Sequence, residues 1–147
     1  MSDRELLWEL APDLFNEEPD AARRVAVLGL LDAIATRPGE RPEDVLLDLK
    51  LVDDRRLALA LALRSGLRYE GLRDFVPDER LFLYLPLPIA TAERLLPIAL
   101  TDDTLVVATA FVDADLSYLQ RMFPNLQLER VIAPRNDILE ALQRVTR

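Results

Sequence analysis

Apolar residues recur at helical spacing near the start of the chain, and polar residues fill the positions between them. Four leucines within residues 3–16 share one helical face, which predicts an amphipathic helix: Leu6, Leu7, Leu10 and Leu14. Pro12 lies inside this stretch. Because proline removes a helix hydrogen bond, we expect the helix to kink or end near Glu9–Ala11.

A second helix is predicted over residues 20–36, between Pro19 and the pair Pro38-Gly39. Its apolar residues cover more than one face: Val25, Val27, Leu28, Leu30, Leu31 and Ile34. A helix that is apolar on several faces is typical of a buried position, so we expect this one to be well buried.

A pair of short helices follows within residues 41–66. Pro42 suits the first turn of the first helix, and acidic residues follow it at the positive end of the helix dipole. The second helix is predicted over residues 54–64, with Asp53 as its N-cap and Ser65-Gly66 at its end.

Strand signals come late in the chain. Two apolar runs, 95–100 and 105–110, flank a short polar turn and predict a β-hairpin. Alternation over residues 126–133 predicts a further strand. The remaining predicted elements are a short strand at 67–69 and helices over 77–84, 113–122 and 135–145.

This order, helices first and strands late, predicts an α+β fold. We expect an N-terminal helical extension and a helix pair, then a small mixed sheet made of the hairpin, a helix and a strand, with a C-terminal helix. A boundary is expected near Pro38-Gly39. It would divide the chain into a helical extension over residues 1–37 and an α+β domain over residues 38–147.

Composition narrows the classes of function. The 147 residues include no His and no Cys, the net charge is −8, and the four glycines form no phosphate-binding loop. The usual general base and the thiolate ligands and nucleophiles are therefore missing, so we predict a protein that is not an enzyme and needs no metal or cofactor. The acidity disfavours nucleic acid as a partner. No apolar run is long enough for a membrane span and no signal peptide begins the chain, so we expect a cytoplasmic protein without membrane insertion.

Two local features offer alternatives to this interpretation. Asp113 and Asp115 follow an apolar strand and match the D-x-D pattern of magnesium-dependent phosphotransferases, although an aspartate before a helix is ordinarily a cap. Trp8 lies on the apolar face of the first helix, which must pack either on its own domain or on a partner protein.

The helix pair also carries a family pattern. The spacing L-x-x-A-L-A-x-x-x-G occurs from Leu57 to Gly66, and further residues keep the order of that pattern: Gly39, Leu46, Leu51, Val52, Leu67, Tyr69, Pro86, Pro97, Leu105, Val107 and Ala108. From about Arg37 to Val145 the chain thereby resembles the N-terminal domain of type II secretion and type IV pilus assembly ATPases.

Some members of that family bind cyclic di-GMP through two copies of R-L-G-x-x-L-x-x-x-G, with arginine on guanine or phosphate and glycine allowing close approach of the backbone. Here Arg41 is present, but Pro42 and Glu43 replace the Leu and the first Gly, and Lys50 replaces the second Gly. A second copy is not found. Arg41 therefore remains the candidate for an alternative role as a cyclic di-GMP receptor.

The resemblance implies a protein–protein interaction or regulatory domain, because the sequence holds no G-x-x-x-x-G-K-[ST] for ATP hydrolysis. In the family this domain docks on an inner-membrane platform protein or regulates the attached motor. We therefore expect one of these as partner, at the inner face of the inner membrane, and leave self-association into a homo-oligomer open. Four residues on the exposed side of the helix pair are candidates for partner contact together with Trp8: Asp48, Lys50, Arg55 and Arg56.

Overall fold

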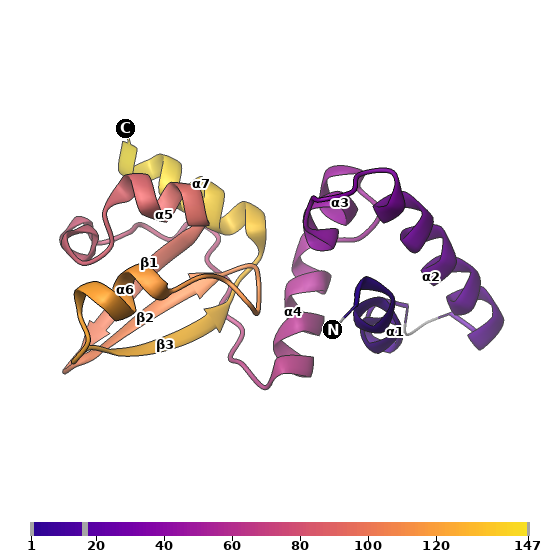
Figure 1. The fold of residues 1–147 in the computed structure, drawn as a ribbon, viewed down its shortest axis with the longest axis horizontal. Coiled ribbons are helices and arrows are strands. Elements are labelled where there is room, and N and C mark those ends of the chain that lie inside the picture. Colours follow the sequence, from indigo (N-terminus) through magenta and orange to yellow (C-terminus); the bar gives the residue numbers. More distant parts are fainter. Residues whose placement is uncertain (1, 16–17, 147) are drawn as a thin grey trace.

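The computed structural model describes residues 2–15 and 18–146. Figure 1 shows a helical half beside a half built around a sheet. The helical half contains α1 (Asp3–Leu14), α2 (Asp20–Ala35), α3 (Pro42–Asp48) and α4 (Asp54–Ser65). The sheet half contains the 3₁₀ helix η1 (Glu79–Leu83), α5 (Leu87–Glu93), β1 (Leu95–Thr101), β2 (Thr104–Thr109), α6 (Ser117–Met122), β3 (Gln127–Ile132) and α7 (Arg135–Thr146).

Helix α1 does not end at its proline. Ser2 and Glu5 form a reciprocal capping box at its start, and the helix then runs through Pro12 to Leu14. The predicted end of the helix near Glu9–Ala11 is therefore wrong, while the alternative of a kink there stays a prediction. Burial of residues on both sides of the proline outweighs the lost hydrogen bond: Leu7, Leu10, Ala11 and Leu14. Asn16, the last residue of the predicted segment, lies outside the described residues.

Helix α2 is amphipathic rather than buried on all sides. Val27, Leu30 and Ile34 are buried against α1 and α3, whereas Val25 is 70% exposed and Leu28 47% exposed. The prediction of general burial is therefore wrong. Figure 1 gives the reason, because α2 lies at the outer edge of the helical half and has neighbours on one side.

Helix α3 ends in a Schellman motif, in which the backbone N–H groups of Lys50 and Leu51 bond to the carbonyls of Leu47 and Leu46 at 3.1 and 2.9 Å. Lys50 takes the left-handed conformation at φ 56°. Glycine is the usual residue there, since a side chain is strained at positive φ.

Substitution of this lysine by glycine should therefore stabilise the fold. We expect Lys50→Gly to raise the free energy of unfolding by about 1 kcal/mol in urea titrations. Gly66, at φ 72° after α4, is the matched control, because Gly66→Ala meets no atom within 4 Å and should lose a similar amount through strain alone. Equal stability of Lys50→Gly and the unchanged chain would contradict the strain argument.

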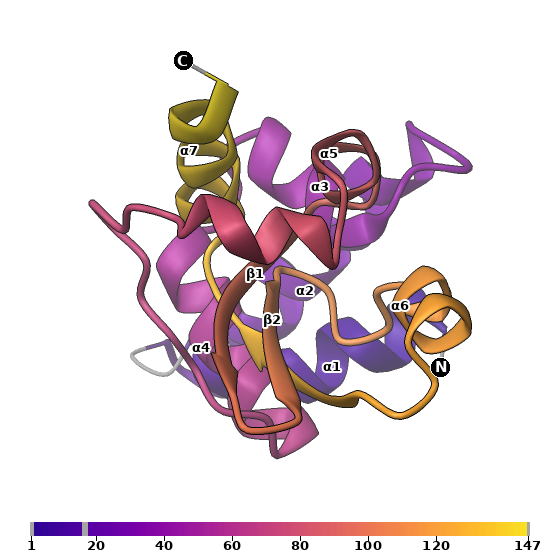
Figure 2. The ribbon, with the colours of Figure 1, turned by 90° about the vertical axis from the view of Figure 1, so that its left-hand side faces the viewer.

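The sheet has the order β1-β2-β3, with β1 antiparallel to β2 and β2 parallel to β3. This mixed sheet, together with the helices, confirms the predicted α+β class. Helices α5 and α7 pack on β1, and α4 packs on β3, as Figures 1 and 2 show from two sides. Alternation of side chains along β3 divides the core, since Val131 joins the sheet cluster while Ile132 joins the cluster of α1 and α4.

Three local predictions need correction. Residues 67–69 form no strand, and Tyr69 makes a single bridge to Ile132. The segment predicted as a helix over 77–84 forms the 3₁₀ helix η1. The next helix, α5, was not predicted, although a proline such as Pro88 suits the first turn of a helix. The helix expected from Asp113 begins at Ser117 instead, because the backbone N–H of Ser117 donates to the Asp115 carboxylate at 2.9 Å and fixes a turn there.

Candidate functional site

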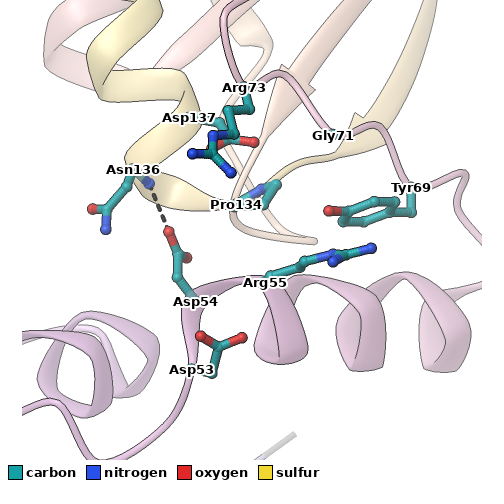
Figure 3. A pocket seen from close by; sticks show the side chains of 9 residues that line it. All are labelled: Asp53, Asp54, Arg55, Tyr69, Gly71, Arg73, Pro134, Asn136 and Asp137. Carbon is teal, nitrogen blue, oxygen red and sulfur yellow. Dashed lines mark hydrogen bonds between the residues drawn. The ribbon is translucent and has the colours of Figure 1, made fainter.

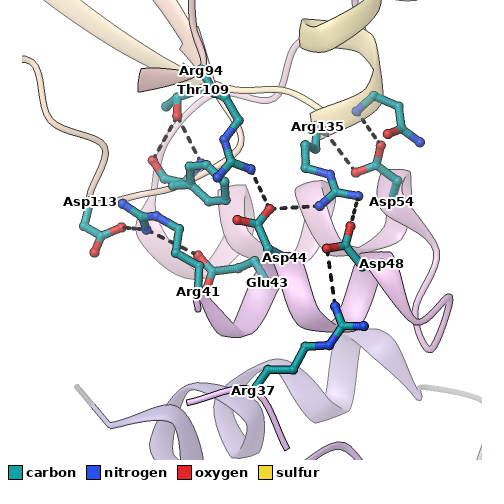
Figure 4. Close-up of polar contacts among 12 residues, drawn as sticks. Arg37, Arg41, Glu43, Asp44, Asp48, Asp54, Arg94, Thr109, Asp113 and Arg135 are labelled. Atoms are coloured by element: carbon teal, nitrogen blue, oxygen red, sulfur yellow. Dashed lines mark hydrogen bonds and ion pairs between the residues drawn. The ribbon is translucent and has the colours of Figure 1, made fainter. Parts of the chain in front are cut away.

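A charged groove lies where α3 faces the sheet half. Its cavity of about 410 Å³ is lined by Gly39, Glu40, Arg41, Asp44, Asp48, Arg94 and Arg135. These residues come from α3 and the turn before it, from the end of α5 and from the start of α7, so segments far apart in sequence form one site (Figure 4).

Asp44 is the centre of the groove. Its Oδ1 accepts from Arg94 Nη1 at 2.7 Å and from Arg135 Nη1 at 2.9 Å, and Arg135 Nη2 also pairs with Asp48 at 2.9 Å. Burial of the Asp44 carboxyl raises its pKa, but the hydrogen bonds from the two guanidinium groups outweigh burial and hold the pKa below its usual range. Asp44 is therefore a fixed anion that joins α3 to α5 and α7.

Arg41 occupies the neighbouring end of the groove. Its Nη1 donates to Asp113 Oδ1 at 2.7 Å, and its guanidinium lies 4.2 Å from the centre of the Phe111 ring. The Arg94 guanidinium lies 4.9 Å from the same ring. The fully buried Thr109 fixes the backbone that carries this ring, because its hydroxyl accepts from the Phe111 backbone N–H at 3.1 Å.

Arg94 reaches the groove from a strained position. It ends α5 in the left-handed conformation, at φ 53°, where glycine would be less strained. The arginine contacts both Asp44 and Phe111 from there, which no glycine could do.

Glu43 lies beside Arg41 and is buried, with its carboxylate 3.8 Å from the guanidinium. Burial raises the pKa of this carboxyl, against the opposing effects of its own backbone N–H and of Arg41. The folded protein thus favours the protonated form of Glu43 more than the unfolded chain does.

Glu43→Gln should consequently stabilise the protein at pH 7, since it removes a charge from a buried position. The contribution of Glu43 is most favourable below its unfolded pKa of about 4.5 and falls as pH rises through the folded pKa. The gain in the variant should therefore shrink toward pH 4. Thermal unfolding at pH 4 and pH 7 measures it, with the exposed Glu79→Gln as control, and a gain independent of pH would contradict it.

The electrostatic balance of the groove follows from these contacts. Arg37, Arg41, Arg94 and Arg135 each pair with at least one carboxylate of the chain itself. The groove therefore has the arginines of an anion site, but side chains of the protein already neutralise them.

The structure separates the residues that the sequence singled out. Arg41 and Asp48 lie in the groove, while Arg55 and Arg56 are exposed on α4 and Lys50 follows α3. Trp8 is half-buried against the cluster formed by α1, α2 and α3.

Sequence reasoning missed Arg94, which lines the groove, and Phe111, whose ring lies beside it. Both lie between predicted elements, and no motif marks them. The sequence marks Asp44 only as one of the acidic residues after Pro42. Its two partners, Arg94 and Arg135, lie 50 and 91 positions further along the chain.

A second cavity, of about 450 Å³, lies between the start of α4 and the start of α7, lined by Asp53, Asp54, Arg55, Tyr69, Gly71, Arg73, Pro134, Asn136 and Asp137 (Figure 3). Asp54 caps α7, because its carboxylate accepts from the backbone N–H groups of Arg135 at 3.0 Å and Asn136 at 2.8 Å. Asp137 accepts from the backbone N–H of Leu72 at 2.9 Å. The Asp54 carboxylate therefore joins α4 of the helical half to α7 of the sheet half, whereas Asp137 fixes a loop within the sheet half.

The D-x-D pattern does not form a metal centre in the part of the chain that the structure describes, where no three His, Cys, Asp or Glu side chains gather in a suitable arrangement. Asp113 pairs with Arg41, which holds the pKa of its carboxyl below the usual range, and Asp115 accepts from a backbone N–H. Over residues 2–15 and 18–146, no helix combines the length and apolar character that crossing a membrane requires.

Comparison with known proteins gives a consistent family. A model described as the MshEN domain matches residues 65–147. The solved structure titled "Structure of MshE with cdg" is 26% identical, with a TM-score of 0.64 over 92% of this chain and 97% of that chain. The N-terminal domain of XpsE matches in two crystal forms. One is 21% identical with a TM-score of 0.68, over 98% of this chain and 96% of that chain; the other is 22% identical with a TM-score of 0.57, over 98% and 97%. No match was found among curated proteins.

Proposed function

Since the chain belongs to the MshEN domain family, we propose that it is a non-enzymatic docking and regulatory domain of a secretion or pilus system. Its partner is an inner-membrane platform protein or an assembly ATPase, and it acts at the inner face of the inner membrane. The fold shared with the XpsE N-terminal domain supports this proposal at the level of architecture.

The pairing of the groove arginines with carboxylates of the chain itself supports docking rather than binding of an anionic ligand. The groove arginines are already paired with Asp44, Asp48 and Asp113, and Glu43 is buried beside Arg41. An anionic ligand would have to displace these carboxylates and approach a buried acid, which costs electrostatic energy. The groove therefore serves to fix the helical half on the sheet half, and the outer surface is left for partners.

Binding to purified cytoplasmic domains of the platform protein and to the assembly ATPase of the same system tests the proposal. We expect saturable binding to one of them by titration calorimetry, with an affinity in the range of transient complexes, roughly micromolar. Binding to neither would contradict the proposed function.

A cyclic di-GMP receptor is the second candidate function. The structure of MshE with cdg is 26% identical to this chain over nearly its whole length, and Arg41 lies in the groove beside an aromatic ring here. This candidate requires saturable binding of cyclic di-GMP that Arg41→Ala abolishes and that Arg121→Ala, at an exposed position of α6, leaves unchanged. We expect a flat titration, because the chain's own carboxylates occupy the arginines.

A further inference from the structure

The outer face of α2 is apolar and exposed. Val25 is 70% exposed and Leu28 47% exposed, whereas Val27, on the inner side of the helix, is fully buried against α1 and α3. In Figure 1, α2 lies at the outer edge of the helical half. At 3.6 residues per turn, four exposed apolar residues share this outer face: Ala21, Val25, Leu28 and Ala35.

A glycine interrupts the middle of this helix on its exposed side. Gly29 costs helix stability, because glycine inside a helix is less favourable than alanine by about 1 kcal/mol. Packing within the described residues does not require it, since a Cβ at this position meets no atom within 4 Å. The missing side chain leaves the backbone beside Leu28 open to close approach, which a second helix packed on this face would use.

Two opposite charges lie on this face at equal distances from Leu28. Arg24 is four positions before it and Asp32 four positions after it, so each lies about one turn away on the same side of the helix. Both side chains are exposed, and neither forms an ion pair within the described part of the chain. The neighbouring Arg23, by contrast, pairs with Asp20 at 3.7 Å. The face is therefore neutral, with its two charges placed symmetrically about an apolar centre.

From this arrangement we propose that the outer face of α2 binds the same face of a second copy of the chain, as an antiparallel helix pair with its twofold axis at Leu28. Residues equally far before and after Leu28 then face each other across the axis. Arg24 of each copy meets Asp32 of the other, and Ala21 meets Ala35. A parallel pair would instead place like charges side by side, which is unfavourable. Self-association through α2 is independent of the proposed docking function.

The length of α2 sets the expected strength of the dimer. The helix has 16 residues and is about 24 Å long, so a contact along it buries less than the roughly 1,200 Å² of a stable interface. We therefore expect a weak, reversible dimer with a dissociation constant on the order of 100 µM. Sedimentation equilibrium of the purified full chain up to about 1 mM measures it, and a chain that stays monomeric throughout overturns the proposal.

Reversal of the two charges tests the antiparallel arrangement. Arg24→Asp and Asp32→Arg each replace both attractions by repulsions, so each should raise the dissociation constant about tenfold or more. The double variant Arg24→Asp/Asp32→Arg should regain the affinity of the unchanged chain, and an equal mixture of the two single variants should form a heterodimer. Arg121→Asp, at an exposed position of α6, is the control for charge and should dimerise as the unchanged chain does. A double variant that stays weakened would contradict the arrangement.

Substitution of the apolar centre tests the surface itself. Val25→Glu should raise the dissociation constant about tenfold or more, because the dimer buries the new carboxylate without a partner. Leu83→Glu is the matched control, since Leu83 is 81% exposed but lies on η1. If the chain dimerises and neither Val25→Glu nor the charge reversals change the dissociation constant, the α2 surface is wrong. All the substituted side chains are exposed, so circular dichroism should show that each variant keeps its fold.

Discussion

Replacing Arg135 by methionine should lower the free energy of unfolding by about 2–3 kcal/mol at pH 7. The Arg135 side chain is 13% exposed and holds Asp44 at 2.9 Å and Asp48 at 2.9 Å. Its loss leaves the 11%-exposed Asp44 with Arg94 as its ion-pair partner. A buried carboxylate that loses one of its ion-pair partners strongly destabilises the fold, even where the intact ion pair adds little to the free energy of unfolding. Urea unfolding followed by Trp8 fluorescence measures the loss.

Two controls distinguish the loss of the Arg135–Asp44 ion pair from a general effect of removing an arginine. Arg121→Met, at an exposed position of α6, should change stability by less than about 0.5 kcal/mol. Adding Asp44→Asn to Arg135→Met should cost less than the sum of the two single changes, because the unpaired charge is then absent. A loss below about 1 kcal/mol in Arg135→Met would show that solvent screens the groove.

The pH dependence of this loss has a definite sign. Since the pKa of Asp44 is below its usual value of 3.8 in the folded protein, its stabilising contribution is present above that value and is lost as pH falls through the folded pKa. The difference between Arg135→Met and the unchanged chain should therefore diminish below about pH 4.

Replacing Ile132 by alanine should lower the free energy of unfolding by about 3 kcal/mol and loosen the helical half from the sheet. Ile132 is fully buried and packs from β3 into the cluster that contains Leu10, Leu57 and Leu61. Alanine keeps the backbone bonds to Arg68 and Glu70 but leaves a cavity at the contact between the halves. Hydrogen exchange should become faster in α4.

The neighbouring Val131 is the matched control. It is equally buried but points to the opposite side of the sheet, into the cluster with Ile138 and Leu142 of α7. Val131→Ala should cost about 2 kcal/mol and increase exchange in α7 rather than α4. The same exchange pattern in both variants would mean that the two halves do not open separately.

The resemblance to the N-terminal domain of secretion and pilus ATPases, stated from motif order, is confirmed by the family match and the solved structures. The spacing of apolar residues was sufficient to identify the family, because that spacing is set by the local periodicity of each helix and strand. Leu57 and Leu61 face the core as their spacing predicts, and Asp53 and Gly66 cap α4. The division into residues 1–37 and 38–147 stays a prediction.

Predictions failed where packing with distant residues decides the outcome. Pro12 is tolerated within α1 because buried neighbours hold the helix, and Val25 is exposed because no element covers that side of α2. Pro86 and Pro88 look like a helix end in isolation, yet they open α5. At Pro12 and Val25 the tertiary environment outweighed the local signal, whereas at Pro86 and Pro88 the local signal for the start of a helix was missed.

The sequence by itself determined the helices with strong caps, the hairpin, the α+β class and the absence of histidine and cysteine chemistry, because each depends on neighbouring residues or on composition. Only the tertiary structure decided which charges meet. It brings Arg41 to Asp113 and Arg135 to Asp44, and it places Arg56 beside the exposed leucines of α4. Coulomb and hydrogen-bond energies depend on distances between residues remote in sequence, and no periodicity along the chain encodes those distances.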